Sequence, residues 1–321
     1  MREKPRIVVS KCLEFEACRW NGLKISNPII SQLMSFIEFI PVCPEVGIGL
    51  EIPRDPIRLI ERDNNTLLVD SSTEEDFTEK MKIFSQTFLE NLPQIDGFIM
   101  KTRSPSCGLT NVKVYPKAGK AMVLNAKGVG LFAQAVKDNF PLAAIEDEGR
   151  ILNLKIREHF FTKVYTIMRY HNLPIKMAAL IEFHARNKYL FMAYNQIELK
   201  IAGKIVANHE KNPVEKVFED YQSSLDRLLY SPPKKTTHIN VLQHIFGYFS
   251  EELNLTEKAI FLNLLEQYRE LQIPLVALTS MLKSWAARFD QKYILKQYYL
   301  QPYPKELQTI FDSGKGRMYE T

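Results

Sequence analysis

Hydrophobic positions follow two different periodicities along the chain. Residues 1–150 alternate short runs of β-branched residues with amphipathic segments, a pattern typical of an α/β domain with a mostly parallel sheet. The pattern predicts strands at residues 6–10, 40–43, 97–101 and 142–146 and helices at residues 72–92 and 128–139. We therefore predict a Rossmann-like layered domain, in which ligands bind beyond the carboxyl ends of the strands.

From Leu152 onward, apolar residues recur at helical spacing. Helices are predicted at residues 153–171, 176–194, 213–229, 239–249, 256–271, 274–289 and 290–300, and a loop at residues 231–237. The chain is therefore interpreted as an α/β domain over residues 1–150 and a connecting helix or linker over residues 151–175. An all-α domain over residues 176–311 and a flexible tail over residues 312–321 complete it.

The two halves also differ in charge and in reactive side chains. Residues 1–150 hold 19 Lys and Arg against 20 Asp and Glu, and residues 151–321 hold 23 against 17, so the second half accounts for the net charge of +5. All four cysteines lie in the first third of the chain, and all six histidines lie after residue 150. The hydrophobic fraction of 45% excludes a disordered protein. The sequence also lacks the run of ~18 apolar residues that a membrane helix needs, which excludes a protein that spans a membrane by helices. Its charged start lacks a signal sequence, so we expect a cytoplasmic protein with no membrane partner.

Each cysteine falls at a predicted strand end or in a tight loop, at Cys12, Cys18, Cys43 and Cys107. A disulfide scaffold is disfavoured in a cytoplasmic chain of this size. Zinc is disfavoured because the spacing has no C-x-x-C pair and no histidine lies in the same domain. Thiolates from separate loops suit an iron–sulfur cluster, and a cluster with three protein ligands leaves one iron open to substrate. The alternative is four inert, buried thiols, although the surrounding Gly-, Pro- and Ser-rich loops are poor core material.

Four ordered motifs in the first half resemble the thiouracil desulfidase family. They are Ser-Lys-Cys12-Leu with Cys18-Arg-Trp-Asn-Gly22, then Cys43-Pro-Glu45, then Gly49-Leu-Glu-Ile-Pro53-Arg54, and finally Lys101-Thr-Arg103-Ser104-Pro-Ser106-Cys107-Gly108. The resemblance implies a 4Fe–4S cluster held by Cys12, Cys43 and Cys107, with Cys18 beside the cluster or as the alternative ligand to Cys12. It also implies that the enzyme removes sulfur from a thiolated pyrimidine without net redox change.

The same motifs provide candidate catalytic residues. An open iron is a Lewis acid that can bind the thiocarbonyl sulfur and polarise the C–S bond. Glu45 is the candidate acid/base, and Ser104, with Ser106 as the alternative, is the candidate for orienting the pyrimidine or a proton. The competing interpretations are an ion pair of Glu45 with Arg54 or Arg19 and a turn-capping role for Ser104.

The second half, from about residue 180 to 307, resembles YbgA-like domains of unknown function, which occur alone or fused behind a desulfidase domain. Matching stretches include Leu180–Leu190, Asn240–Phe249 and Gln297–Leu307, and the resemblance leads us to expect a glycine near Leu271. Two polar-aromatic helical faces, which contain His184 and His244, fit either a binding groove or a buried hydrogen-bonded network.

Fusion of the two domains resembles the variants that act on thiolated tRNA, so the expected substrate is 4-thiouridine in tRNA, converted to uridine and sulfide. The alternatives are a desulfidase of free thiouracil and a non-catalytic iron–sulfur module that binds nucleic acid. The candidate RNA-binding residues are Arg19, Lys101, Arg103, Arg186, Lys188, Lys234 and Lys235. The sequence leaves open whether the protein is a monomer or a homodimer.

Overall fold

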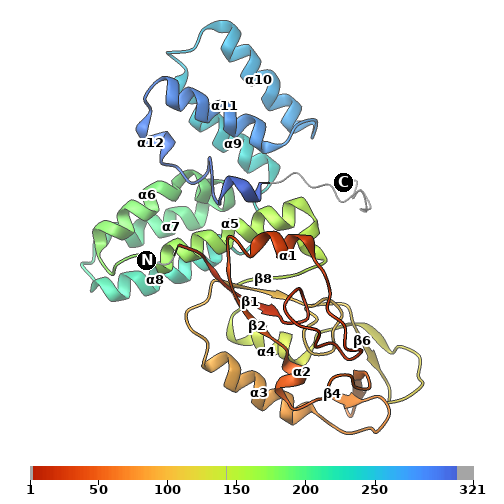
Figure 1. The fold of residues 1–321 in the computed structure, drawn as a ribbon. Helices are drawn as coiled ribbons and strands as arrows, with labels where there is room; N and C mark the ends of the chain where they lie inside the picture. The colour runs from red at the N-terminus through yellow and green to blue at the C-terminus, as the bar shows by residue number, and fades with distance from the viewer. Residues whose placement is uncertain (1–2, 142, 309–321) are drawn as a thin grey trace. The chain divides into compact units, whose positions relative to one another are not determined.

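The computed structural model describes residues 3–308 except residue 142 (Figure 1), so the predicted tail at residues 312–321 lies outside the described residues. The chain divides into two compact units, and the division falls between Phe160 and Phe161. Unit 1 contains the α/β part and unit 2 is helical, which confirms the predicted fold class.

A four-stranded parallel sheet forms the centre of unit 1. Its strand order is β2 (Glu38–Val42), β1 (Arg6–Ser10), β5 (Gly97–Met100) and β8 (Ala144–Asp147). These are the four predicted strands, with bounds that shift by at most two residues. The central strands β1 and β5 are almost wholly buried, as expected for a parallel sheet that is covered on both faces.

The register of this sheet aligns the carboxyl ends of its strands. Ser10 of β1 pairs with Val42 of β2, and Met100 of β5 pairs with Asp147 of β8. The residues that follow directly therefore meet at one edge, and they include Cys12, Cys43, Lys101 and Glu148. This is the edge at which open α/β sheets bind ligands.

A second four-stranded sheet in unit 1 was not predicted. Its order is β4 (Asn65–Asp70), β3 (Ile57–Arg62), β6 (Val112–Tyr115) and β7 (Asn125–Gly128). Asp63 and Asn64 connect β3 to β4 with φ angles of 50° and 62°, the left-handed conformation that a two-residue hairpin turn requires. The predicted helix at residues 128–139 begins later than expected because β7 extends to Gly128.

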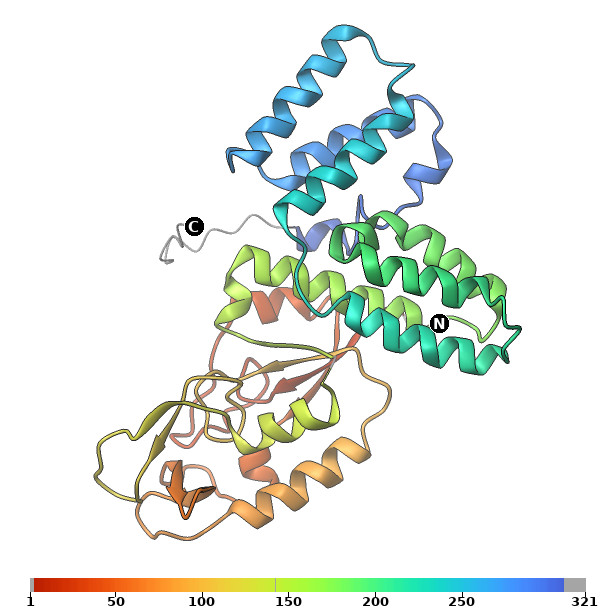
Figure 2. The same ribbon diagram turned by 180° about the vertical axis from the view of Figure 1, so that it is seen from behind.

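The helices of unit 1 are α1 (Pro28–Leu33), α2 (Pro44–Gly47), α3 (Thr78–Glu90), α4 (Leu131–Asn139), the 3-10 turn η1 (Arg150–Leu152) and the start of α5 (Leu154–His171). The prediction that α3 begins at residue 72 is wrong, because the Asp70 carboxylate accepts hydrogen bonds from the amides of Ser72 and Thr73 and holds a turn there. Helices α3 and α4 lie side by side (Figure 2). They share one buried cluster with strand residues such as Val8 and Phe98.

Unit 2 continues with α6 (Met177–Tyr194), α7 (Gln196–Ala207), α8 (Val214–Leu228), α9 (Lys235–Phe246), η2 (Gly247–Phe249), α10 (Leu255–Arg269), α11 (Leu275–Arg288), α12 (Lys292–Leu295) and η3 (Lys305–Leu307). Three predictions here are wrong. Helix α7 was missed, the predicted loop at residues 231–237 gives way to α9 at Lys235, and the helix predicted at residues 290–300 is reduced to the single turn of α12. Among the described residues, no helix is long and apolar enough to span a membrane.

The core of unit 2 is built mainly from aromatic and aliphatic side chains, including the fully buried Tyr221, Phe261 and Leu282. Near residue 271, where we expected a glycine, the backbone adopts the conformation that glycine favours, although the residue is leucine. Leu271 adopts φ 60° where α10 ends, and the Gln272 amide donates to the Gln267 carbonyl at 2.8 Å. This geometry closes a helix with a left-handed residue, a position that glycine usually fills, so the backbone turn is present although its residue is leucine.

Candidate active site

A cavity of about 380 Å³ lies at the carboxyl edge of the parallel sheet in unit 1. All four cysteines line it, and all four are free thiols. Cys12 follows β1, Cys43 follows β2 and Cys107 lies on the loop after β5, whereas Cys18 lies in the loop between β1 and α1. The structure therefore brings the predicted cluster ligands together.

The thiols differ in acidity because their surroundings differ. Cys43 precedes α2, and hydrogen bonds from the Cys18 thiol and the Val46 amide lower its pKa to about 7. Burial, together with the neighbouring Cys43, raises the pKa of Cys12 to about 12. Burial also raises the pKa of Cys107 well above its ordinary value, and Cys12 and Cys43 shift it in the same direction. Cys12, Cys43 and Cys107 line one cavity, where their thiolates would repel one another, and this favours a cationic centre between them.

The donor set, three thiols around one cavity, suits an iron–sulfur cluster. Among the described residues, no three His, Cys, Asp or Glu side chains surround one point closely enough to hold one metal ion. The ligands of a cluster bind different irons, so they stand farther apart than the ligands of one ion. Three thiols that open onto a cavity with spare volume match that requirement.

Glu45 lies in the first turn of α2, at the wall of the cavity. Its Oε2 forms an ion pair with Arg54, one of the competing interpretations, and the two side chains are 14% and 7% exposed. Its Oε1 accepts a hydrogen bond from the Ser106 hydroxyl at 3.0 Å and a longer one from the Ser104 hydroxyl at 3.4 Å. One carboxylate oxygen is therefore fixed by a guanidinium, and the other faces the serine hydroxyls.

The two candidate serines have different surroundings. Ser104 lines the cavity, and its Oγ also accepts hydrogen bonds from the amides of Ser106 and Cys107 at 3.2 and 3.1 Å, so it caps the turn as well. Ser106 is fully buried and is not among the residues that line the cavity. The hydroxyl available to a ligand is therefore that of Ser104.

Two residues of the site were not predicted to matter beyond an ion pair of Arg54 with Glu45, and Gly130 had no predicted role. Arg54 donates to the carbonyls of Cys18 and Glu51 at 3.2 and 3.0 Å in addition to its ion pair, so it connects the Cys18 loop to the candidate base. Gly130 begins α4 against the Cys107 loop, where a Cβ would lie only 2.4 Å from the Ser106 carbonyl oxygen. The Gly-Val-Gly sequence before α4 was the available signal for this close approach.

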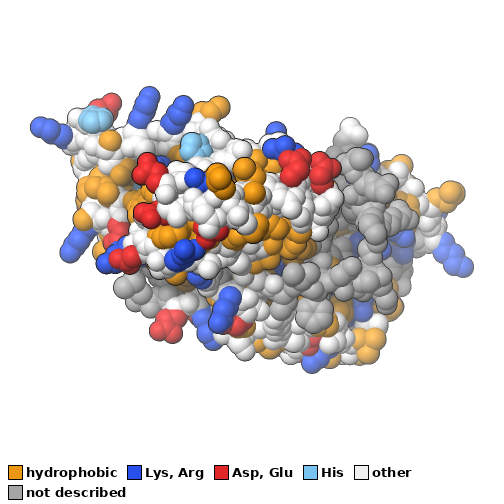
Figure 3. Space-filling view, turned by 90° about the horizontal axis from the view of Figure 1, so that it is seen from above, with side chains coloured by type: hydrophobic (Ala, Val, Ile, Leu, Met, Phe, Trp, Pro, Cys, Tyr) orange, Lys and Arg blue, Asp and Glu red, His pale blue; other side chains and the backbone are white. Residues whose placement is uncertain are grey.

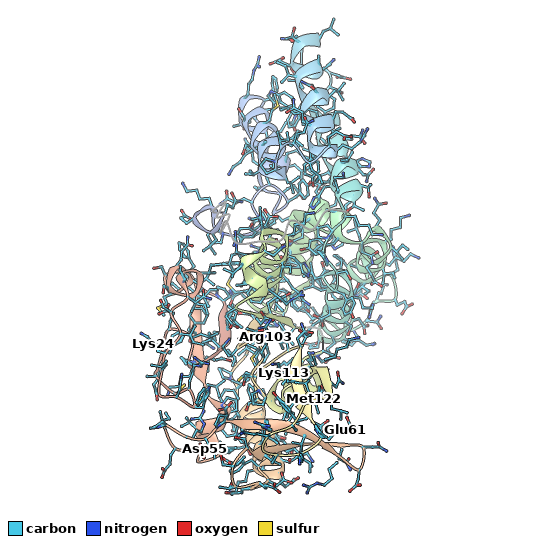
Figure 4. The ribbon with its side chains drawn as sticks, turned by 90° about the vertical axis from the view of Figure 1, so that its right-hand side faces the viewer. Lys24, Asp55, Glu61, Arg103, Lys113 and Met122 are labelled. Atoms are coloured by element: carbon cyan, nitrogen blue, oxygen red, sulfur yellow. The ribbon has the colours of Figure 1, made fainter. Side chains whose placement is uncertain are left out.

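Five cationic side chains line the cavity, and two of them have no carboxylate partner among the residues that the structure describes. Lys11 pairs with Glu16, Arg54 with Glu45, and Lys101 with Glu148. The guanidinium groups of Arg19 and Arg103 make no hydrogen bond or ion pair with any residue that the structure describes, and Arg103 is exposed (labelled in Figure 4). The indole of Trp20, 44% exposed, lines the same cavity. The cavity thus offers two free positive charges and an aromatic ring to a ligand.

The predicted RNA-binding residues of unit 2 fall into two groups. Arg186 packs over the Tyr298 ring with its guanidinium carbon 4.5 Å from the ring centroid, and Lys235 donates to the Arg269 carbonyl at the end of α10, so both have structural contacts. Lys188 and Lys234 are exposed. On the face seen in Figure 3, Lys and Arg side chains are spread among acidic and hydrophobic ones rather than gathered in one patch.

The two polar-aromatic faces also differ. His184 shares a hydrogen bond of 3.0 Å with the Tyr221 hydroxyl, and the buried Asn187 donates to the Phe183 carbonyl at 2.8 Å. Of these two bonds, only the one between His184 and Tyr221 joins two helices, α6 and α8, and Lys188 on the same face is exposed. His244 on α9 is exposed.

Comparisons with known proteins divide the chain in the same way. Residues 7–148 match the model of a family described as 2-thiouracil desulfurase, and residues 188–304 match one described as a protein of unknown function, DUF1722. The chain is 27% identical over 147 residues to the uncharacterized protein YbgA of Escherichia coli (strain K12), covering 44% of this chain and 87% of that protein. It is 29% identical over 136 residues to the uncharacterized protein YbbK of Bacillus subtilis (strain 168), covering 40% and 90%.

Among solved structures, a 4Fe-4S-dependent thiouracil desulfidase, TudS, is similar with 24% identity and a TM-score of 0.36, over 46% of this chain and 93% of that one. The two family models confirm the resemblances predicted from the motifs of each half.

Proposed function

We propose that this protein is an iron–sulfur desulfidase that converts 4-thiouridine in tRNA into uridine and sulfide. The observation that carries the proposal is the convergence of Cys12, Cys43 and Cys107 on one cavity that Glu45 and Ser104 also line. Its volume of about 380 Å³ is in the range of small-ligand sites, roughly 300–1,000 Å³. The match to the 2-thiouracil desulfurase model supports cleavage of a C–S bond.

Cys12, Cys43 and Cys107 would hold a 4Fe–4S cluster, with Cys18 as a neighbour rather than a ligand, since its backbone carbonyl accepts a hydrogen bond from the Cys43 thiol at 3.9 Å. When bound, the cluster supplies a Lewis-acidic iron with an open position that polarises the C–S bond of the substrate. Lys101, held between Glu148 and the Thr102 carbonyl, places a positive charge near Cys12.

The proposed reaction is a hydrolysis without an oxidant or reductant. The oxygen of a water molecule bonds to C4 of the base, the C4–S bond breaks with its electrons on sulfur, and the two water protons end on that sulfur as hydrogen sulfide. Glu45 Oε1 accepts a proton from the water and returns it to the departing sulfur. Arg54 fixes the other carboxylate oxygen, and the Ser104 hydroxyl orients the pyrimidine at the cavity wall.

The charges at the cavity favour a substrate that carries phosphate. Arg19 and Arg103 suit phosphates beside the thiolated base, and the exposed Trp20 ring suits stacking with a base that has left its helix. The second candidate is free thiouracil, which is favoured by the fact that every proposed catalytic group lies in unit 1.

The test uses full-length protein reconstituted anaerobically. We expect the near-ultraviolet absorbance of the thiocarbonyl to disappear from 4-thiouridine-containing tRNA with equimolar release of sulfide, and kcat/KM to be lower for the nucleoside and for free 4-thiouracil. Glu45→Gln should lower kcat by about 10²- to 10⁴-fold with unchanged bound iron. Glu51→Gln, an exposed side chain on the loop that follows α2, is the matched control.

Two results would contradict the proposal in different ways. Unchanged thiocarbonyl absorbance in every substrate, with the cluster intact, would rule out a desulfidase. If kcat/KM for free 4-thiouracil equals or exceeds that for tRNA, the protein is still a desulfidase, but the assignment of tRNA as its substrate is contradicted.

A further inference from the structure

Three tyrosines from separate elements of unit 2 form a cluster, which we call the tyrosine cluster. Tyr189 lies in α6, Tyr248 in η2 and Tyr293 in α12. The ring centroids are 6.3, 6.3 and 6.2 Å apart in the three pairs. The Tyr248 and Tyr293 rings are stacked with an interplanar angle of 30°, and the Tyr189 ring meets both edge to face.

The cluster is anchored on its inner side and open on its outer side. Tyr189 is 3% exposed, whereas Tyr248 and Tyr293 are 42% and 38% exposed. The Tyr189 and Tyr248 hydroxyls are hydrogen-bonded at 3.0 Å. The buried Gln297 donates to the Ala185 carbonyl at 2.9 Å and accepts from the Tyr189 amide at 3.4 Å. The two exposed rings are therefore held in place before any ligand binds.

Positive charge flanks the cluster on the same elements. The Nζ of the exposed Lys188 lies 5.6 Å from the Tyr189 ring centroid, and the exposed Lys296 follows Tyr293 by three residues. Neither lysine has an ion-pair partner within the described part of the chain. Lys292, in contrast, forms an ion pair with Asp290 at 3.4 Å, and both of these side chains are highly exposed. Fixed aromatic rings beside unneutralised lysines are the combination that binds unpaired nucleic-acid strands, because every base has a π face and every nucleotide a phosphate.

We infer that Tyr248 and Tyr293 form a platform on which unpaired bases of RNA stack, and that Lys188 and Lys296 contact the adjacent phosphates. The inference rests on the proposed function, since it assigns a second place at which the RNA substrate is held. The chemistry is sequence-tolerant, so the platform recognises unpaired bases and leaves the choice of the thiolated base to the cavity of unit 1.

The test measures binding of a fluorescent oligouridylate of about 12 nucleotides, a length within the range that such sites cover. The full-length protein is used, with Tyr248→Leu and Tyr293→Leu as the variants. Each should weaken binding by about 10-fold or more, because base stacking is lost while apolar volume is kept. The corresponding phenylalanine variants should retain most of the affinity. Tyr230→Leu is the control, since Tyr230 is 67% exposed and has no ring contact among the described residues.

Two further measurements separate stacking from charge and binding from catalysis. Lys188→Gln and Lys296→Gln should each reduce the slope of log Kd against log salt by about 0.7. Turnover of the free 4-thiouridine nucleoside should stay unchanged in all these variants, since they leave the cavity of unit 1 intact.

Equal affinity of the wild type and both leucine variants for oligouridylate would overturn the platform and leave the desulfidase proposal standing. Binding of phosphatidylglycerol–phosphatidylcholine vesicles without binding of oligouridylate would also overturn it, by identifying the surface as a lipid site. Conversely, tyrosine-dependent oligouridylate binding by a protein that turns over no thiolated substrate would support the platform and contradict the proposed reaction.

Discussion

At Gly130, a single added methyl group should displace the Cys107 loop of the candidate active site without removing any thiol, carboxylate or hydroxyl group from it. A Cβ there would lie 2.4 Å from the Ser106 carbonyl oxygen and 2.9 Å from the Gly108 amide nitrogen. Ordinary heavy-atom contacts are near 3.5 Å, so alanine must separate α4 from the Cys107 loop by about 1 Å. Backbone hydrogen bonds from Gly130 to Gly108 (2.8 Å), Leu131 to Pro105 (3.1 Å) and Ala133 to Ser106 (3.0 Å) cross this contact.

We expect Gly130→Ala to lower the free energy of unfolding of unit 1 by about 2 kcal/mol, the usual cost of overpacking a close contact. It should also reduce bound iron, because Cys107 moves with its loop. The control is Gly247→Ala, where a Cβ meets nothing within 4 Å and the φ of −54° suits alanine, so stability should be unchanged or slightly higher.

Urea unfolding followed by Trp20 fluorescence reports on unit 1 if it is measured in a Trp285→Phe background, since the chain has only these two tryptophans. Bound iron after anaerobic reconstitution gives the second readout. If Gly130→Ala has the same unfolding midpoint and iron content as the background protein, the close packing of α4 on the Cys107 loop does not have the role that we assign to it.

Three smaller perturbations test unit 2. Leu271→Gly should raise the free energy of unfolding by about 1 kcal/mol in urea titrations, because glycine adopts the left-handed backbone without strain; a loss of stability would contradict the turn geometry. Asn195→Ala should lower it by about 1 kcal/mol, since the Asn195 side chain caps α7. Burial lowers the pKa of His238 to about 4, so its neutral form stabilises the fold above pH 6.5. That contribution should fall by about 2 kcal/mol between pH 7 and 5, a pH dependence that His238→Asn should remove.

The parallel sheet and the convergence of the cysteines were predictable for one physical reason. Strands that are buried on both faces read as continuous apolar runs, and their carboxyl ends share an edge, so Cys12, Cys43 and Cys107 had to approach one another. The second sheet was not recognised because each of its strands is partly exposed and none reads as a continuous apolar run, and its hairpin turn is Asp-Asn rather than the stronger Asn-Gly signal.

Side-chain partners were harder to predict than elements. The sequence could not show whether Arg186 or Lys235 faces solvent or a carbonyl group, and the structure gives each a contact within unit 2. The importance of Gly130 and the burial of Arg54 depend on contacts between segments that are distant in sequence. The tyrosine cluster had a weak signal in the alternation of Lys292, Tyr293 and Lys296, but its anchoring by Gln297 is a tertiary property.

The central claim is that three of the four thiols hold an iron–sulfur cluster in the cavity of unit 1. Iron and acid-labile sulfide, measured with the visible absorption spectrum after anaerobic reconstitution, test it most directly in the wild type and in four single Cys→Ser variants. We expect equal amounts of iron and sulfide in the wild type and in Cys18→Ser, and a large loss of both in the Cys12, Cys43 and Cys107 variants. Zinc in place of iron, or a cluster that survives loss of Cys12, Cys43 or Cys107 but not of Cys18, would contradict the account.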